Sequence, residues 1–84
     1  GTAARRWIRA GELLHHVLDP RTGMPARTPW RAVTVAAASC LEANLASTTT
    51  IVRGAAGLTW LRARDLPARL VGEDGSVVRL RGWP

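Results

Sequence analysis

The pattern of hydrophobic and polar positions predicts β-strands in the first half of the chain. Residues 5–10 and 12–18 are short β-prone segments on either side of Ala10-Gly11, and we expect them to pair as a hairpin. Residues 32–36 read Ala-Val-Thr-Val-Ala, which is apolar on both faces and therefore typical of a central strand. Residues 24–29 contain two prolines and predict an extended or irregular loop.

A helix is predicted next, and its start carries a capping signal. Ser39 and Glu42 match a capping box, in which Ser39 accepts the backbone N–H of Glu42 and the Glu42 side chain reaches back. Gly54 is expected to end the helix. Positions at helical spacing predict a core-facing stripe, formed by Leu41, Leu45, Thr48, Thr49 and Val52. The run of three threonines at 48–50 is a poor helix former, so close backbone packing, or hydroxyls with a chemical role, explains it better.

The last third of the chain predicts a second helix and a closing hairpin. The helix is expected over residues 55–63, ended by Asp65-Leu66-Pro67. Residues 68–71 and 76–80 flank an Asp-Gly pair, which is a strong hairpin signal. The predicted fold class is therefore α+β, an antiparallel sheet (hairpin, central strand, C-terminal hairpin) with two helices packed on one face. The 84 residues suffice for one small domain with a thin core.

The stretch from His15 to Pro25 holds the densest candidate chemistry of the chain. The segment from Asp19 to Thr22 fits a type I turn, and Gly23 permits a positive φ after it. Successive side chains of a strand point to opposite faces, so only one of His15 and His16 can face a given site. From these residues alone, the stretch is either an active-site loop or a turn that backbone geometry explains completely.

Composition adds a positive charge without a clear pattern. All twelve basic residues are arginines, and with six acidic residues the net charge is +6. Such a charge suits nucleic acid, but the arginines are scattered from Arg5 to Arg81 and no aromatic stacking surface interleaves with them. A compositional bias toward arginine is the simpler interpretation. The single cysteine, Cys40, excludes an internal disulfide and is expected to be a small buried residue. No apolar run approaches the length of a membrane span.

Two blocks of the sequence resemble the FAD:protein FMN transferases, the ApbE family. Residues 16–25, His-Val-Leu-Asp-Pro-Arg-Thr-Gly-Met-Pro, resemble the family signature H-I-I-D-P-x-T-G-x-P. Residues 33–35 and 39–48 resemble its segment VTV…S-x-x-x-A-D-x-x-x-T, with fitting spacing. Residues 1–7 resemble the remainder of the family's T-S-G entry to the hairpin. The resemblance implies that residues 1–84 are the C-terminal part of a longer, T-fold-like flavin transferase domain, cut from it before residue 1.

The resemblance implies a magnesium-dependent reaction on FAD. The family splits the pyrophosphate of FAD, releases AMP and attaches FMN through a phosphoester to a Thr of a target flavoprotein, and some members hydrolyse FAD instead. For this chain it implies Mg²⁺ as cofactor and FAD as substrate. It implies as partners a Thr-containing acceptor flavoprotein and the remaining N-terminal part of the protein, and no nucleic acid. Cytoplasmic and membrane-associated or extracytoplasmic bacterial locations both stay open.

The resemblance also assigns roles to residues of the opening block. His16 matches the family histidine three residues before the aspartate, where it would take the proton of the acceptor Thr, since the imidazole pKa of about 6.5 suits a base. Contacts with the flavin are implied for the backbone of Leu18 and for Asp19, Thr22 and Gly23.

The second block implies Mg²⁺ ligands at Asn44, Ser47 and Thr48, of which Asn44 and Thr48 share a helix face. Asn44 departs from the family, which has Asp there. Because Mg²⁺ favours carboxylate oxygen, losing a unit charge about 4 Å away removes attraction on the order of 4 kcal/mol at an effective dielectric near 20. We therefore expect weaker or differently completed metal binding.

Three functions stay open on these grounds. The leading one is the C-terminal part of an FMN transferase, which by itself is expected to be inactive. The alternative is an FAD-binding relative with weakened or only hydrolytic activity, motivated by Asn44. The alternative of another class is a small arginine-rich nucleic-acid-binding module.

Overall fold

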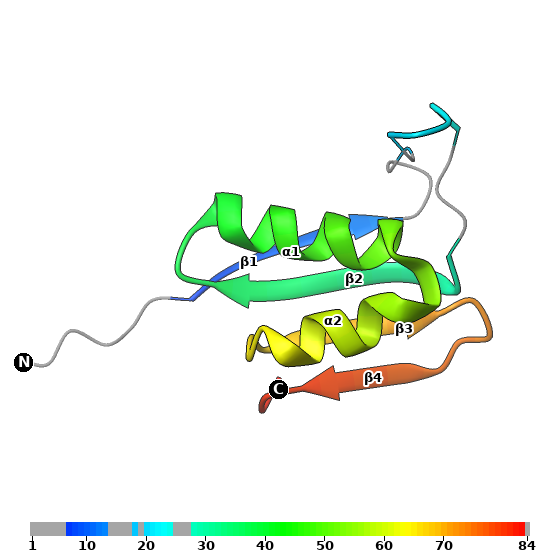
Figure 1. Cartoon of the computed structure of the whole chain (residues 1–84). Helices are drawn as coiled ribbons and strands as arrows, with labels where there is room; N and C mark the ends of the chain where they lie inside the picture. The colour runs from blue at the N-terminus through cyan, green and yellow to red at the C-terminus, as the bar shows by residue number, and fades with distance from the viewer. Residues whose placement is uncertain (1–6, 14–17, 19, 25–27, 84) are drawn as a thin grey trace, which may run out of the picture.

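The fold is a four-stranded antiparallel sheet with two helices on one face (Figure 1). The computed structural model describes residues 7–13, 18, 20–24 and 28–83. The strands follow one another across the sheet in the order β1-β2-β3-β4. The elements are β1 (Ile8–Leu13), β2 (Trp30–Ala37), α1 (Cys40–Val52), the 3₁₀ turn η2 (Gly54–Ala56), α2 (Gly57–Ala63), β3 (Ala68–Gly72) and β4 (Val77–Leu80). The predicted α+β class is confirmed.

The predicted turn at Ala10-Gly11 is wrong, because β1 runs straight through these residues. It pairs with β2 from Ile8 opposite Ala37 to Leu13 opposite Ala32. A Cβ atom at Gly11 would lie 2.9 Å from the Thr34 hydroxyl oxygen. Gly11 therefore marks a close approach of two strands and not a reversal of the chain.

Helix α1 begins as predicted but presents a different face to the core. The Ser39 hydroxyl accepts the backbone N–H of Glu42 at 3.1 Å, which confirms that half of the capping box. The core-facing stripe predicted from Leu41 and Leu45 is wrong, because these side chains are 69% and 58% exposed. The buried positions are instead Ala43, Ala46, Ser47, Thr50 and Ile51.

Small side chains let α1 lie close to the strands beneath it. The two buried hydroxyls are satisfied within the helix, since Thr50 donates to the Ala46 carbonyl at 2.8 Å and Ser47 to the Asn44 carbonyl at 3.1 Å. Burying them therefore leaves no polar group without a partner. The helix ends at Val52, and Gly54 follows with a φ of 64°, as predicted for a glycine at a helix C-terminus.

The core lies between the helices and the sheet. Its buried side chains are Trp30, Val33, Val35, Ala46, Ile51, Leu61, Ala68, Leu70 and Leu80. Trp30 ties the start of β2 to the end of α1, because its indole N–H donates to the Gly54 carbonyl at 2.9 Å. α2 lies beside α1 in front of β3 and β4 (Figure 1). No helix of the described residues is long and apolar enough to cross a membrane.

The predicted C-terminal hairpin is confirmed. β3 and β4 pair from Ala68 opposite Leu80 to Val71 opposite Val77. The Asp74 carboxylate closes the turn by accepting the N–H and the hydroxyl of Ser76, at 2.9 and 2.6 Å. Gly75 adopts a φ of 86°, the left-handed conformation that a glycine at this position allows.

Candidate functional site

The first block of candidate residues lies in the loop between β1 and β2. His16 and Asp19 fall outside the described residues, so their assignments stay predictions. Residues 20–22 form a turn, and Gly23 follows with a φ of 69°, which confirms that the glycine redirects the chain. The Thr22 hydroxyl accepts the backbone N–H of Met24 at 3.2 Å. Leu18 forms an isolated β-bridge while its side chain is exposed.

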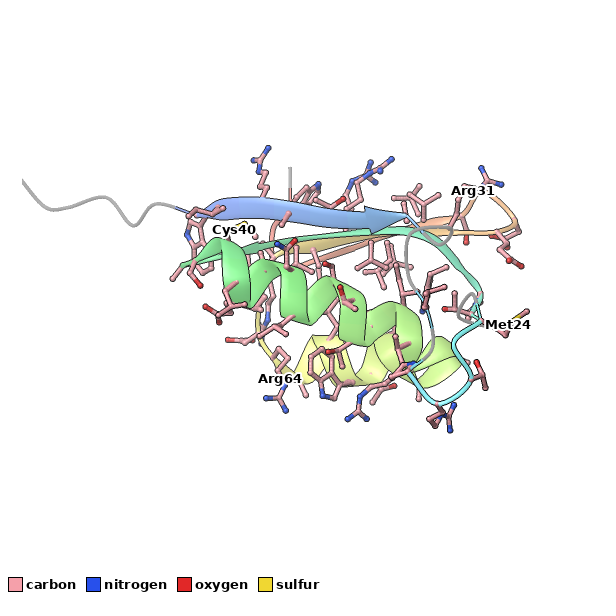
Figure 2. All side chains as sticks on the ribbon, turned by 90° about the horizontal axis from the view of Figure 1, so that it is seen from above. Met24, Arg31, Cys40 and Arg64 are labelled. Carbon is pink, nitrogen blue, oxygen red and sulfur yellow. The ribbon has the colours of Figure 1, made fainter. Side chains whose placement is uncertain are left out.

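Both figures place this loop at the end of the molecule where β1 and α1 finish and β2 begins (Figures 1 and 2). Met24 marks its outer tip in Figure 2, with its side chain exposed. The described side chains of the loop, from Pro20 to Met24, are all exposed.

The second block lies on α1, between its buried and its exposed face. Asn44 and Thr48 are one turn apart and both half-buried, so their side chains share a flank of the helix. The Asn44 side-chain amide donates to the Cys40 sulfur at 3.5 Å, which leaves its amide oxygen as the group able to meet a cation. This flank of α1 therefore presents two neutral oxygens to a possible cation, the Asn44 amide oxygen and the Thr48 hydroxyl.

Ser47 differs from its two neighbours in the block. Its side chain is fully buried, and its hydroxyl proton is engaged by the Asn44 carbonyl. A direct bond from the Ser47 hydroxyl to a cation would require this side chain to become accessible. Its assignment as a ligand stays a prediction.

The donor set fits Mg²⁺ only in part. The described residues contain no group of three His, Cys, Asp or Glu side chains that could hold a metal ion. Mg²⁺ prefers carboxylates, phosphates and water in octahedral geometry, whereas Asn44 and Thr48 carry no charge. The negative charge of such a site would have to come from the substrate phosphates or from residues beyond those described.

Cys40 corrects another expectation, because it is exposed and not buried. It is the first residue of α1, and this first turn lies past the end of β2, where Figure 2 labels it at the edge of the sheet. Its sulfur accepts the Asn44 amide. Cys40 thereby helps to orient Asn44, which the sequence alone did not indicate.

A groove between the two helices was also missed by sequence reasoning. It has a volume of about 670 Å³ and is lined by Leu41, Leu45, Trp60, Arg64 and Leu66, among others. The guanidinium of Arg64 lies 5.0 Å from the centre of the Trp60 ring, and that of Arg53 lies 5.4 Å from it. The groove was not predicted because helical periodicity placed Leu41 and Leu45 in the core, whereas both are exposed.

Comparison with known proteins gives a family and a fold. The sequence model of the ApbE family matches residues 1–70. The solved structure of the flavin transferase ApbE from Vibrio cholerae is similar to this chain, with a TM-score of 0.77 and 24% identity, and covers 92% of it. A histidine-to-glycine mutant of that protein gives a TM-score of 0.75 and 25% identity, again over 92% of this chain.

The match covers only part of these larger proteins. The chain spans 29% of the Vibrio cholerae structure and 27% of the structure of its mutant, which is less than a third of either. No curated protein matches the chain.

Proposed function

The chain belongs to the ApbE family, and on this premise we propose that it is the C-terminal part of a flavin transferase domain. The observation that carries the proposal is the family match over residues 1–70, which includes both blocks of candidate residues. The proposed reaction transfers FMN from FAD to a Thr hydroxyl of an acceptor flavoprotein and releases AMP. The chain would work together with the part of the domain that lies outside it.

We assign the proton transfer to His16. In the proposed reaction the acceptor oxygen forms a bond to the FMN phosphorus, the pyrophosphate bond of FAD breaks, and AMP leaves with the electron pair. The acceptor hydroxyl must lose its proton as the bond forms, and a neutral imidazole can accept it near neutral pH. Leu18, Asp19, Thr22 and Gly23 are assigned to contact with the flavin, and the turn at 20–22 with the positive φ of Gly23 supports a backbone shaped for a ligand.

We propose that α1 contributes to a Mg²⁺ site through the oxygens of Asn44 and Thr48, with Ser47 as the third predicted member. The shared flank of Asn44 and Thr48 supports this assignment. Mg²⁺ bound there would neutralise the charge of the FAD pyrophosphate. Cys40 would help to orient the Asn44 side chain by accepting its amide N–H.

The test is a transfer assay with the polypeptide that the gene encodes. It is incubated with FAD, Mg²⁺ and a Thr-containing acceptor, and AMP release and an acceptor mass gain of one FMN are measured. His16→Ala is expected to lower the rate at least about a hundredfold, the typical contribution of a general base. His15→Ala is the matched control and is expected to retain the rate. Transfer by His16→Ala at the original rate would remove the assignment of the base.

The neutral Asn44 favours a second candidate, an FAD-binding relative with weakened or only hydrolytic activity. Such a protein would bind FAD and release FMN and AMP without a mass gain of the acceptor. Asn44→Asp is then expected to tighten Mg²⁺ binding at least about tenfold, because a carboxylate replaces a neutral amide. Thr59→Asp places the same charge on the exposed side of α2 and is expected to leave the affinity unchanged. Unchanged affinity in Asn44→Asp would exclude Asn44 as a ligand.

A further inference from the structure

The face of the sheet opposite the helices has no second layer in the described part of the chain. Figure 2, seen along the sheet, shows both helices on one side and side chains ending in nitrogen on the other. The strand registers define this surface, here called the open face, as Arg9, Gly11, Ala32, Thr34, Ala36, Arg69, Val71, Val77 and Arg79. It is built from two different halves.

The middle of the half over β1 and β2 is made of small residues, namely Gly11, Ala32 and Thr34. At one end of this half, Arg9 lies opposite the buried Ala36 and stacks on Trp83. Gly11 leaves the Thr34 hydroxyl uncovered, since a Cβ atom there would lie only 2.9 Å from it. A floor without long side chains lets the backbone of another element approach closely. Val71 and Val77 continue this floor with apolar surface, half-buried and exposed respectively.

The half over β3 and β4 carries two arginines in direct register. Thr34, Arg69 and Arg79 lie opposite one another on three consecutive strands. Like charges directly opposite each other destabilise a sheet. Among the described residues, neither guanidinium forms a hydrogen bond or an ion pair, although Arg69 is half-buried.

Other described arginines show that partners are available elsewhere in the fold. Arg9 stacks on Trp83 at 5.0 Å from the ring centre. Arg31 donates to the Glu73 carbonyl at 2.9 Å. Arg81 forms an ion pair with Asp65. The Arg69–Arg79 pair therefore lacks a partner of the kinds that this chain provides to other arginines, and a bidentate carboxylate would relieve the repulsion.

We propose that the open face packs against the part of the flavin transferase fold outside this chain, through an element that places a carboxylate between Arg69 and Arg79. This rests on the proposed function above. The chain spans less than a third of the flavin transferase structures that it resembles, so their folds contain the residues for a second layer. Such a layer would bury the small and apolar residues of the open face. A second copy of this chain fits poorly, because two faces from chains of net charge +6 would repel each other.

The first test is chemical labelling of arginine with phenylglyoxal, read by mass spectrometry. The polypeptide that the gene encodes is compared with the 84-residue chain. Arg69 and Arg79 are expected to react at least about tenfold more slowly in the encoded polypeptide, because paired guanidinium groups are withdrawn from the reagent. Arg53, exposed at the end of α1 on the helix side, is the control and is expected to react alike in both. Equal labelling of Arg69 and Arg79 would overturn the proposal.

The second test compares the direction in which one charge reversal shifts the melting temperature of two polypeptides. In the 84-residue chain, Arg79→Glu turns a like-charge pair into an ion pair with Arg69, so the melting temperature is expected to rise. In the encoded polypeptide the same change places Glu against the proposed carboxylate, so the melting temperature is expected to fall. A rise in both would overturn the proposal.

Other occupants of the open face would leave different traces. Protection that disappears on dilution would identify a second copy, and protection that disappears after nuclease treatment would identify nucleic acid. Either result overturns the proposal. The proposed function is judged separately, because labelling does not depend on FAD turnover. If Arg69 and Arg79 are protected but the polypeptide transfers no FMN, the second layer is supported and the proposed function is not. If the polypeptide transfers FMN but the two arginines are not protected, the proposed function is supported and the second layer is not.

Discussion

At the scale of single residues, Gly57 is a position with almost no room for a side chain. It begins α2 against the preceding helix, and a Cβ atom there would lie 2.1 Å from the Thr50 carbonyl oxygen and 2.9 Å from its carbon. Backbone cannot move aside as a flexible side chain can. We expect Gly57→Ala to lower the free energy of unfolding by about 1–3 kcal/mol through overpacking, measured by urea denaturation. The exposed Thr59→Ala is the control, expected to stay within about 0.5 kcal/mol; an equal effect of both would contradict the prediction.

The turn between β3 and β4 makes a prediction about pH. The Ser76 hydroxyl, and next its backbone N–H, donate to the Asp74 carboxylate and hold the pKa of that group below its ordinary value. Because the folded pKa is the lower one, this stabilisation is present above the unfolded pKa of about 3.9. It is lost as the pH falls through the folded value. We expect Ser76→Ala to raise the pKa of Asp74, measured by NMR titration of its carboxyl carbon, and an unchanged pKa would refute the role of Ser76.

At the scale of elements, α1 shows why hydrophobic spacing can point to the wrong face. Leu41 and Leu45 are larger and more apolar than the buried residues of α1 other than Ile51. The buried face of α1 consists mainly of small side chains, and the buried hydroxyls of Ser47 and Thr50 donate to carbonyls of their own helix. Small polar residues can therefore be buried without the usual penalty.

This orientation of α1 can be tested with two truncations on the same helix. Ile51 is fully buried, whereas Leu45 is 58% exposed. We expect Ile51→Ala to lower the free energy of unfolding by about 2–5 kcal/mol and Leu45→Ala to change it by about 0.5 kcal/mol or less in the 84-residue chain. Urea denaturation of both variants measures the difference. The reverse order would restore the face that periodicity predicted.

At the scale of the whole molecule, the arginines behind the net charge of +6 include one pair, Arg69 and Arg79, that lie directly opposite each other in the sheet. In the 84-residue chain, Arg79→Gln should remove this repulsion and raise stability by about 0.2–1 kcal/mol. The gain is expected at an ionic strength of about 0.01 M and should shrink at about 0.5 M, because salt screens exposed charges. Thermal melts at the two salt concentrations measure it.

The control for this prediction is Arg53→Gln. It removes the same charge from the helix side, together with a stacking contact on Trp60, and is expected not to stabilise the chain. Equal gains from both substitutions would show that net charge, and not the register of two arginines, determines the effect.

The candidate residues of this chain lie in two separate elements. Thr22 and Gly23 lie in an exposed loop, and Asn44 and Thr48 on one flank of α1. The motifs placed these residues correctly in a loop and on a helix, since motif spacing reflects local structure. Their joint role as one site is a proposal that involves residues outside this chain, which spans less than a third of the Vibrio cholerae flavin transferase structures.

The sequence by itself determined the features that depend on neighbouring residues. It located the helix start at Ser39, the positive φ of Gly23, the end of the helix near Gly54 and the hairpin turn that contains Gly75. Each follows from the local chemistry of one cap or one turn. The family followed from motifs that span most of the chain.

Only the tertiary structure decided what depends on contacts between distant segments. Gly11 lies in a continuous strand because β1 pairs with β2 along its whole length. Leu45 is exposed because the face of α1 with smaller side chains packs on the sheet. Arg69 and Arg79 became a pair only through the register of β3 with β4. Packing distances and strand registers join residues far apart in the chain, so no local pattern could have set them.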